Sequence, residues 1–123
     1  MTSYFKVKPV RDANYLKAVC KDGCVITGGK GYAHHLKGYG QGSAKASDHL
    51  TFCLSNEYHV AAYDTGIHAN IKEWEKEHGT QIFWIKKTLN KQLKNGTITT
   101  NDYNFAIVEC DDLDFKYNNQ QEQ

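Results

Sequence analysis

The stretch that decides the fold is residues 29–59, which read GKGYAHHLKGYGQGSAKASDHLTFCLSNEYH. Short apolar runs at residues 24–26 and 32–34 flank the pair Gly28-Gly29, which predicts two short strands around a tight turn. Residues 38–48 have the composition of a loop, and residues 49–54 are typical of a short strand. Ser55 is a suitable cap for a helix that continues to Gly66. The sequence therefore predicts an α+β fold.

The segments on either side of this stretch add further elements. We expect a short strand at residues 3–10 and a helix from Asp12 to Gly23. Two more helices are expected at residues 67–79 and 80–96, a strand at residues 104–110, and an acidic tail at about residues 111–123. Trp74 and Trp84 are expected in the core. The predicted buried stripe of the helix at residues 80–96 consists of Ile82, Phe83, Ile85, Leu89 and Leu93.

Length and composition set limits on the class of protein. A chain of 123 residues that is 40% hydrophobic and 24% charged suits one soluble domain, residues 1–123. It has no apolar run long enough to span a bilayer, and its first residues lack a signal-peptide pattern, so we expect a cytoplasmic protein without a membrane partner. Residues 1–96 carry fourteen Lys or Arg and eight Asp or Glu, whereas residues 97–123 carry one Lys and six acids. A basic body is compatible with a polyanionic partner or with an ordinary solvated surface.

The histidines indicate a functional site, because all six lie between positions 34 and 78. Adjacent residues of a strand point to opposite faces, so the pair His34-His35 could direct one imidazole at a metal and the other at a substrate. Helical segments packed across this strand could return His59 and His68 as further ligands. A single histidine is more often a hydrogen-bonded core or surface residue, and it is the clustering that favours a site. His49 and His78 are assigned to exposed or capping positions.

The order of these residues resembles the HNH, or ββα-metal, endonuclease family. In that family a β-hairpin ends in a His pair, and a loop, a short strand and a helix with a further His follow; here the matching stretch is DHLTFCLSNEYH, residues 48–59. Beyond it, the segment WEKEHGTQ, residues 74–81, is similar to an element of the Ref-type, RecA-dependent phage recombination nucleases. The resemblance covers about residues 20–95, and it implies a ββα-metal core with additional helices C-terminal to it.

The resemblance also implies roles for individual residues. His34, His59 and His68 would hold one divalent metal ion, which could be Mg, Mn, Ni or Zn. His35 would be the general base, and Asp48 would pin the loop and orient that base. Tyr63 occupies the simplest position for a third ligand, four residues after His59, but a phenol with a pKa of about 10 is a poor ligand at neutral pH. Lys30, Lys37 and Lys45 are the expected phosphate contacts.

The implied function is a metal-dependent DNA endonuclease from a phage or prophage, acting in recombination or replication in a bacterial host, with a recombinase filament as a further partner. The alternative is a catalytically silent nucleic-acid-binding module of HNH shape. Many relatives carry two C-x-x-C pairs for a structural zinc, but this chain has only Cys20, Cys24 and Cys53 in that region. The sequence therefore argues against a structural zinc, and Cys110 is expected to be a buried apolar residue.

Overall fold

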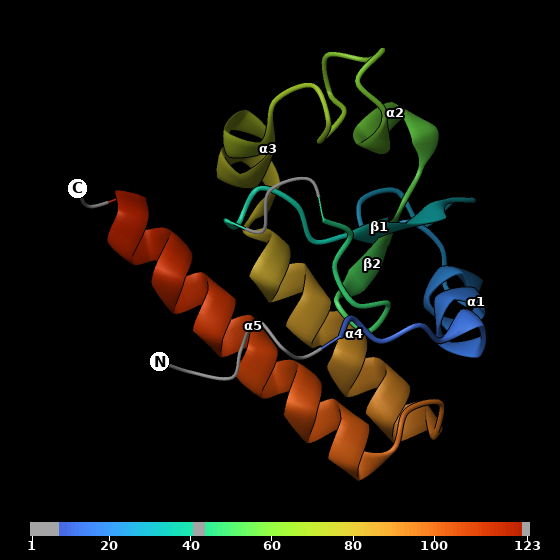
Figure 1. Cartoon of the computed structure of the whole chain (residues 1–123). Helices are drawn as coiled ribbons and strands as arrows, with labels where there is room; N and C mark the ends of the chain where they lie inside the picture. The colour runs from blue at the N-terminus through green and yellow to red at the C-terminus, as the bar shows by residue number, and fades with distance from the viewer. Residues whose placement is uncertain (1–7, 41–43, 122–123) are drawn as a thin grey trace.

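The computed structural model describes residues 8–40 and 44–121 and confirms the mixed α+β class. In this part of the chain it has five helices and one two-stranded antiparallel sheet (Figure 1). The elements are, in order, α1 (Ala13–Lys21), β1 (Tyr32–His35), β2 (Thr51–Leu54), α2 (Asn56–His59), α3 (Ile71–His78), α4 (Gln81–Asn95) and α5 (Thr100–Gln121). None of these helices combines the length and the apolar character that crossing a bilayer requires.

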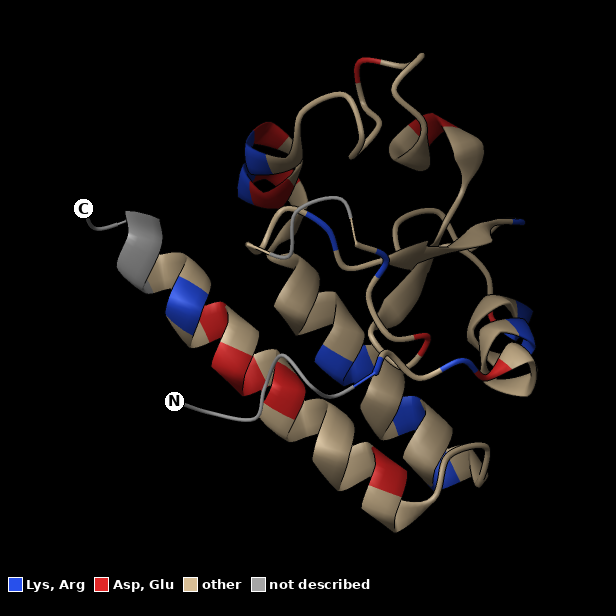
Figure 2. Ribbon diagram, in the orientation of Figure 1, with Lys and Arg blue, Asp and Glu red and all other residues tan. Residues whose placement is uncertain are grey.

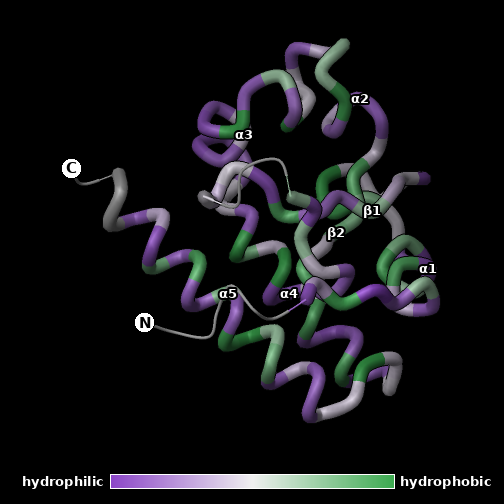
Figure 3. Tube along the Cα trace, in the orientation of Figure 1, coloured by the Kyte–Doolittle hydropathy of each residue, from purple (hydrophilic) through white to green (hydrophobic). Residues whose placement is uncertain are grey.

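The small sheet lies at the centre of the core. β1 pairs with β2 so that His34 stands opposite Phe52 and His35 opposite Thr51. All four residues of β2 are buried, and the sheet contacts both α1 and α4. Hydrophobic side chains from α1, the strands and α4 belong to one continuous core. Figure 3 shows hydrophobic positions along these elements. Burying β2 completely fixes β1 beside it, and β1 carries the histidine pair.

Two of the expected helices begin and end where their local signals indicate. α1 follows Asp12, whose carboxylate accepts a hydrogen bond from the Tyr15 N–H at 3.1 Å. α4 follows Thr80, whose hydroxyl accepts from the Phe83 N–H, and it ends at Gly96 in the left-handed conformation. One member of the expected buried stripe of α4 is wrong, because Phe83 is 52% exposed. It lies on the side of the helix opposite Ile82, Ile85 and Leu89.

The two strands predicted around Gly28-Gly29 are a partial error. Residues 32–35 form β1, but residues 24–28 form turns, because the Cys24 N–H donates to the Gly29 carbonyl and the Gly28 N–H donates to the Cys24 carbonyl. The sheet partner of β1 is therefore β2, and the described residues between the two strands, 36–40 and 44–50, are neither helix nor strand. Cys24 and Cys53 are buried as free thiols, and so is Cys110, as expected.

The predicted N-terminal strand falls largely outside the described residues, which begin at residue 8. Residues 8–10 are not a strand. Val10 instead makes two long-range hydrogen bonds to the segment before β2, since its N–H donates to the Ser47 hydroxyl and its carbonyl accepts from the Asp48 N–H. This segment ties the start of α1 to the loop that holds Asp48.

The helix expected to run from residue 56 to Gly66 stops after one turn. The backbone becomes extended at Val60, and the chain then folds back, so that the Ile67 N–H donates to the Tyr58 carbonyl and the His68 N–H donates to the His59 carbonyl. The next helix begins at Ile71, four residues later than predicted, after an Asn70 cap. These two backbone bonds place His68 beside His59.

The predicted strand at residues 104–110 is wrong, and these residues belong to α5. The Thr99 hydroxyl caps this helix at the Asp102 N–H. The residues that it buries, Ala106, Cys110 and Leu113, repeat at helical spacing, and α5 packs against α4 through this face. The acidic tail from residue 111 therefore continues the same helix to Gln121. Figure 2 shows acidic positions along α5 beside the lysines of α4, and Asp111 forms an ion pair with Lys86.

We expect Gly66→Ala to lower the free energy of unfolding by about 1–3 kcal/mol. A Cβ at Gly66 would lie 1.9 Å from the Val60 carbonyl oxygen, so the return of the chain to α2 would have to open. Urea denaturation followed by circular dichroism measures the change. Gly29→Ala is the matched control, because its Cβ would meet nothing closer than 3.5 Å. Equal stability of the two variants would show that the return does not depend on Gly66.

Candidate metal centre

The candidate site starts at β1, whose two histidines have different surroundings. His34 is 1% exposed, and its ring packs edge-on against Phe52 at a centroid separation of 5.2 Å. His35 is half-buried and stands at the end of the strand. Because successive side chains of a strand alternate, the two imidazoles enter different environments. The prediction that one imidazole of this pair is directed at a metal and the other at a substrate is compatible with this geometry, and it stays a prediction.

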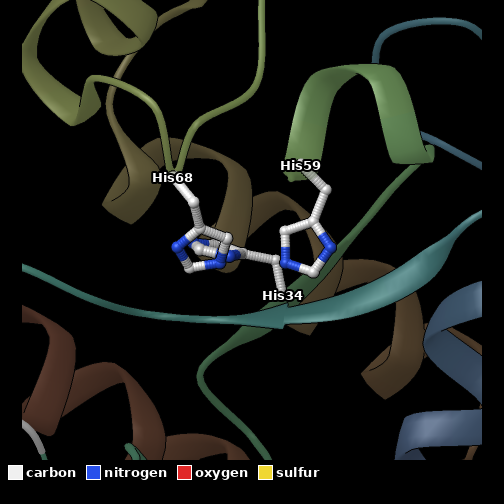
Figure 4. Close-up of side chains that lie close together, drawn as sticks. All are labelled: His34, His59 and His68. Carbon is white, nitrogen blue, oxygen red and sulfur yellow. The ribbon is translucent and has the colours of Figure 1, made fainter. Parts of the chain in front are cut away.

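His59, at the end of α2, and His68, in the segment that returns to it, both lie beside His34. The centroids of their rings each lie 5.1 Å from the centroid of the His34 ring and 4.8 Å from each other. Figure 4 shows the three side chains converging. Each residue offers one ligand nitrogen, and these nitrogens all lie within 4.8 Å of one another. His34 is buried, His59 half-buried and His68 exposed, so the cluster is closed on one side and reachable from solvent on the other. Within the described residues, these three form the group of potential ligands close enough to hold a metal ion.

Tyr63 does not join this cluster. The sequence places it one helical turn after His59, but the chain has already left the helix at Val60. Tyr63 therefore lies in the turn before Gly66, with half of its surface exposed. The structure brings His68, and not Tyr63, to His34 and His59.

All three histidines of the cluster favour the neutral state. Burial lowers the pKa of His34 to about 3, with further lowering from the charges of its histidine neighbours, although a hydrogen bond to Gln81 opposes the shift. Burial and the charge of His68 lower the pKa of His59, and burial and the charge of Lys37 lower that of His68. Neutral imidazoles are the form that binds metal ions, so no proton has to leave before a metal enters at neutral pH.

The cluster also contains an unsatisfied buried atom. His34 Nε2 lies 2.9 Å from Gln81 Oε1, but His34 Nδ1 is buried without a hydrogen-bond partner. Buried polar atoms in native proteins nearly always have a partner, and an orphan calls for an explanation such as a bound ion. Three neutral imidazoles, one with an unused buried nitrogen and one open to solvent, fit a divalent metal of the zinc or nickel type.

His35 belongs to a second polar group, which is centred on Asp48. His35 Nε2 lies 2.9 Å from Asp48 Oδ1, and the Arg11 guanidinium contacts the same oxygen at 3.1 Å. The other carboxylate oxygen accepts a hydrogen bond from the Asp12 N–H at 2.7 Å. Burial raises the pKa of Asp48, but the hydrogen bonds from His35 and Asp12 and the Arg11 charge together bring it below its usual value. Asp48 is thus an ionised carboxylate that holds the Nε2 side of His35.

The surroundings of His35 keep its imidazole neutral near pH 7. Burial lowers the pKa of His35, the hydrogen bond that it donates to Asp48 and the Asp48 charge oppose this shift, and the charges of Lys45 and Arg11 lower the pKa further. His35 also lies close enough to His59 for its charge to lower the pKa of that residue. The histidine cluster and the group around Asp48 are therefore close enough for their charges to interact.

The three predicted phosphate contacts are exposed. Lys37 follows β1, and its charge lowers the pKa of His68. The charge of Lys45 lowers the pKa of His35, so these two lysines lie near the histidines. Lys30 precedes β1, and its place at the site stays a prediction.

Several supporting residues were missed from the sequence. Gln81 and Arg11 look like ordinary surface residues by type, yet Gln81 is fully buried and Arg11 bonds the carbonyls of Lys45 and Ala46 as well as Asp48. His49 was expected at an exposed or a capping position, and the exposed position is wrong. His49 is buried, and its Nε2 lies 3.0 Å from Asp12 Oδ2. The one sequence signal that pointed to Gln81 is the segment WEKEHGTQ, residues 74–81, whose resemblance to the Ref-type element includes Gln81 as its last residue.

A family model described as "Protein of unknown function (DUF968)" matches residues 3–96, more than half of the chain. The chain belongs to the DUF968 family. The DUF968 match includes all the residues of both polar groups and ends where α4 ends, so α5 lies beyond it. Comparison with curated proteins and with solved structures gave no match.

We expect the metal-free DUF968 protein to lose stability as the pH falls below about 6.5. Folding lowers the pKa of His34 from its usual 6.5 to about 3, so between these values the unfolded chain binds a proton that the folded chain does not. Each such group lowers the free energy of unfolding by about 1.4 kcal/mol per pH unit. Urea denaturation in the presence of a chelator, between about pH 7 and pH 5, measures this slope.

His34→Gln is the test variant, and it should show a shallower slope because one of the titrating groups is gone. An unchanged slope would mean that His34 does not carry the effect and that the remaining histidines do.

Proposed function

We propose that this protein is a metal-dependent DNA endonuclease of the HNH, or ββα-metal, type. The observation that carries the proposal is the convergence of His34, whose buried Nδ1 has no partner, with His59 and His68. The next residue of the strand, His35, is held by the Asp48 carboxylate. The order β1, β2, α2 supports a ββα core in which the two strands and the short helix present these groups. One strand would thus supply a metal ligand and a general base side by side.

His34, His59 and His68 are the proposed ligands. Once bound there, a divalent metal would act as a Lewis acid toward the scissile phosphate and the leaving oxygen. Three imidazoles without a carboxylate favour zinc, nickel or a similar ion over magnesium, which prefers oxygen ligands. The exposed side of His68 leaves room for a phosphate oxygen to approach.

His35 is the proposed general base. The Asp48 carboxylate can only accept a hydrogen bond, so His35 carries its proton on Nε2 and has a lone pair on Nδ1. This nitrogen would take the proton from the attacking water, and Asp48 would stabilise the resulting imidazolium. Arg11 and the Asp12 N–H keep Asp48 in place, so the base is oriented before substrate binds.

Lys37 and Lys45 flank the histidines and provide positive charge for a phosphate backbone. The resemblance to the Ref-type phage nucleases makes DNA the proposed substrate, a recombinase filament the proposed further partner, and the cytoplasm of a bacterial host the proposed location.

Metal binding is the first test. We expect His68→Ala to weaken the binding of Zn²⁺ or Ni²⁺ by at least about tenfold in a calorimetric titration at fixed pH. Tyr63→Phe is the matched control, because Tyr63 lies near His68 in sequence but outside the cluster, and it should bind like the wild type. A loss in Tyr63→Phe alone would mean that Tyr63, and not His68, is the third ligand. Failure of the wild-type protein to bind any of these ions would refute the proposed metal centre.

Cleavage is the second test. We expect plasmid nicking in the presence of Mg²⁺, Mn²⁺, Ni²⁺ or Zn²⁺, tried in turn, and a loss of about 10²–10⁴-fold in rate for His35→Ala, because the general base is gone. Metal binding by His35→Ala should stay near that of the wild type, since His35 is not a proposed ligand. DNA binding without nicking by any metal-loaded sample would favour the silent nucleic-acid-binding alternative instead.

A further inference from the structure

The first residue of α4, Gln81, makes an unusual set of contacts for a helix start. Its side chain is fully buried, and its amide forms three hydrogen bonds across the base of the site. Oε1 lies 2.9 Å from His34 Nε2 and accepts from the Lys37 N–H at 3.1 Å, while Nε2 donates to the Lys37 carbonyl at 2.8 Å. Gln81 thus bonds both the buried histidine and the backbone just beyond β1.

These contacts determine which way the amide faces. The Lys37 backbone presents one donor and one acceptor to the side chain, so the oxygen must face the N–H and the nitrogen must face the carbonyl. The group beside His34 Nε2 is therefore an oxygen, which can only accept. His34 must carry its proton on Nε2, and its lone pair must lie on Nδ1, the atom that is buried without a partner.

The position of Gln81 is itself secured from α3. The Gln81 backbone N–H donates to Glu75 Oε2 at 2.8 Å, and the Tyr39 hydroxyl donates to the same oxygen at 2.7 Å. Thr80 caps α4 immediately before Gln81. The segment WEKEHGTQ, residues 74–81, therefore fixes the backbone of Gln81 through the Glu75 carboxylate and the Thr80 cap.

We propose that Gln81 is a positioning residue that selects the Nε2–H form of His34 and so makes Nδ1 the metal-binding atom. This inference rests on the proposed metal site. A histidine ligand is commonly oriented by an acceptor on its second ring nitrogen, and the acceptor can be a carboxylate or a neutral group. Here it is a neutral amide, so the acceptor beside His34 adds no negative charge to the site.

The tautomer of His34 tests the inference without any metal. Nitrogen-15 NMR of the imidazole in chelator-treated wild-type protein near neutral pH should show a proton on Nε2 and none on Nδ1. Gln81→Met removes the acceptor at similar volume, and we expect the His34 signals to move toward a mixture of the two neutral forms. A proton on Nδ1 in the wild type, or an unchanged tautomer in the variant, would overturn the proposal.

Metal affinity is the second measurement. Co²⁺ binding, followed by its visible absorption, should weaken about 10–100-fold in Gln81→Met. Gln92→Met is the matched control, because Gln92 is a buried glutamine of the same helix that bonds Thr97 instead, and it should bind Co²⁺ like the wild type. Gln81→Glu keeps an acceptor for His34 Nε2, so its affinity should lie closer to that of the wild type than that of Gln81→Met does.

The outcomes separate this inference from the proposed function. If the wild type binds no Co²⁺, Zn²⁺ or Ni²⁺, the metal centre fails and the inference fails with it. If the wild type binds metal and Gln81→Met binds it equally well, only the role of Gln81 is refuted. Gln81→Glu that binds as weakly as Gln81→Met would also overturn it, because the acceptor would then have no effect.

Discussion

The pairing of β1 with a completely buried β2 is the constraint on which the rest of the structure depends. It fixes four residues of β1, and side-chain alternation then sends His34 and His35 to different sides. Each imidazole is held at Nε2 by an oxygen from elsewhere in the chain, an amide oxygen for His34 and a carboxylate oxygen for His35. A one-residue slip in register would exchange the two environments and break both contacts.

The choice of oxygen suits the two proposed tasks. A carboxylate beside an imidazole stabilises its protonated form, which helps a group that must accept a proton and later release it. A neutral amide favours the protonated form less than a charged carboxylate does, which suits a ligand that must stay neutral. Burial reinforces the second case, because His34 is almost inaccessible and its pKa falls to about 3.

The sequence predicted what local signals decide. Asp12, Thr80 and Gly96 mark helix ends through their own side chains or their own backbone freedom, and α1 and α4 begin and end there. The group of His34, His59 and His68 was also predicted, from clustering and from the family resemblance. Their role as ligands stays a prediction.

What the sequence could not predict depends on distant contacts. The apolar run at residues 104–110 is too short for its periodicity to separate a strand from a helix, and packing against α4 decides in favour of α5. Residues 60–66 include alanines that favour a helix, but the return of Ile67 and His68 to the carbonyls of α2 ends it. Gln81 has the residue type of a surface position, and only the fold buries it.

The return of the chain after α2 has a consequence for the entropy of ligand assembly. Two proposed ligands, His59 and His68, are separated by a short loop that a backbone hydrogen bond between these same residues already closes. The conformational cost of bringing them together is therefore met during folding, before any ion arrives. An ion that bridges this loop to β1 would bind a preformed pair, so little of its binding free energy would be offset by ordering of the chain.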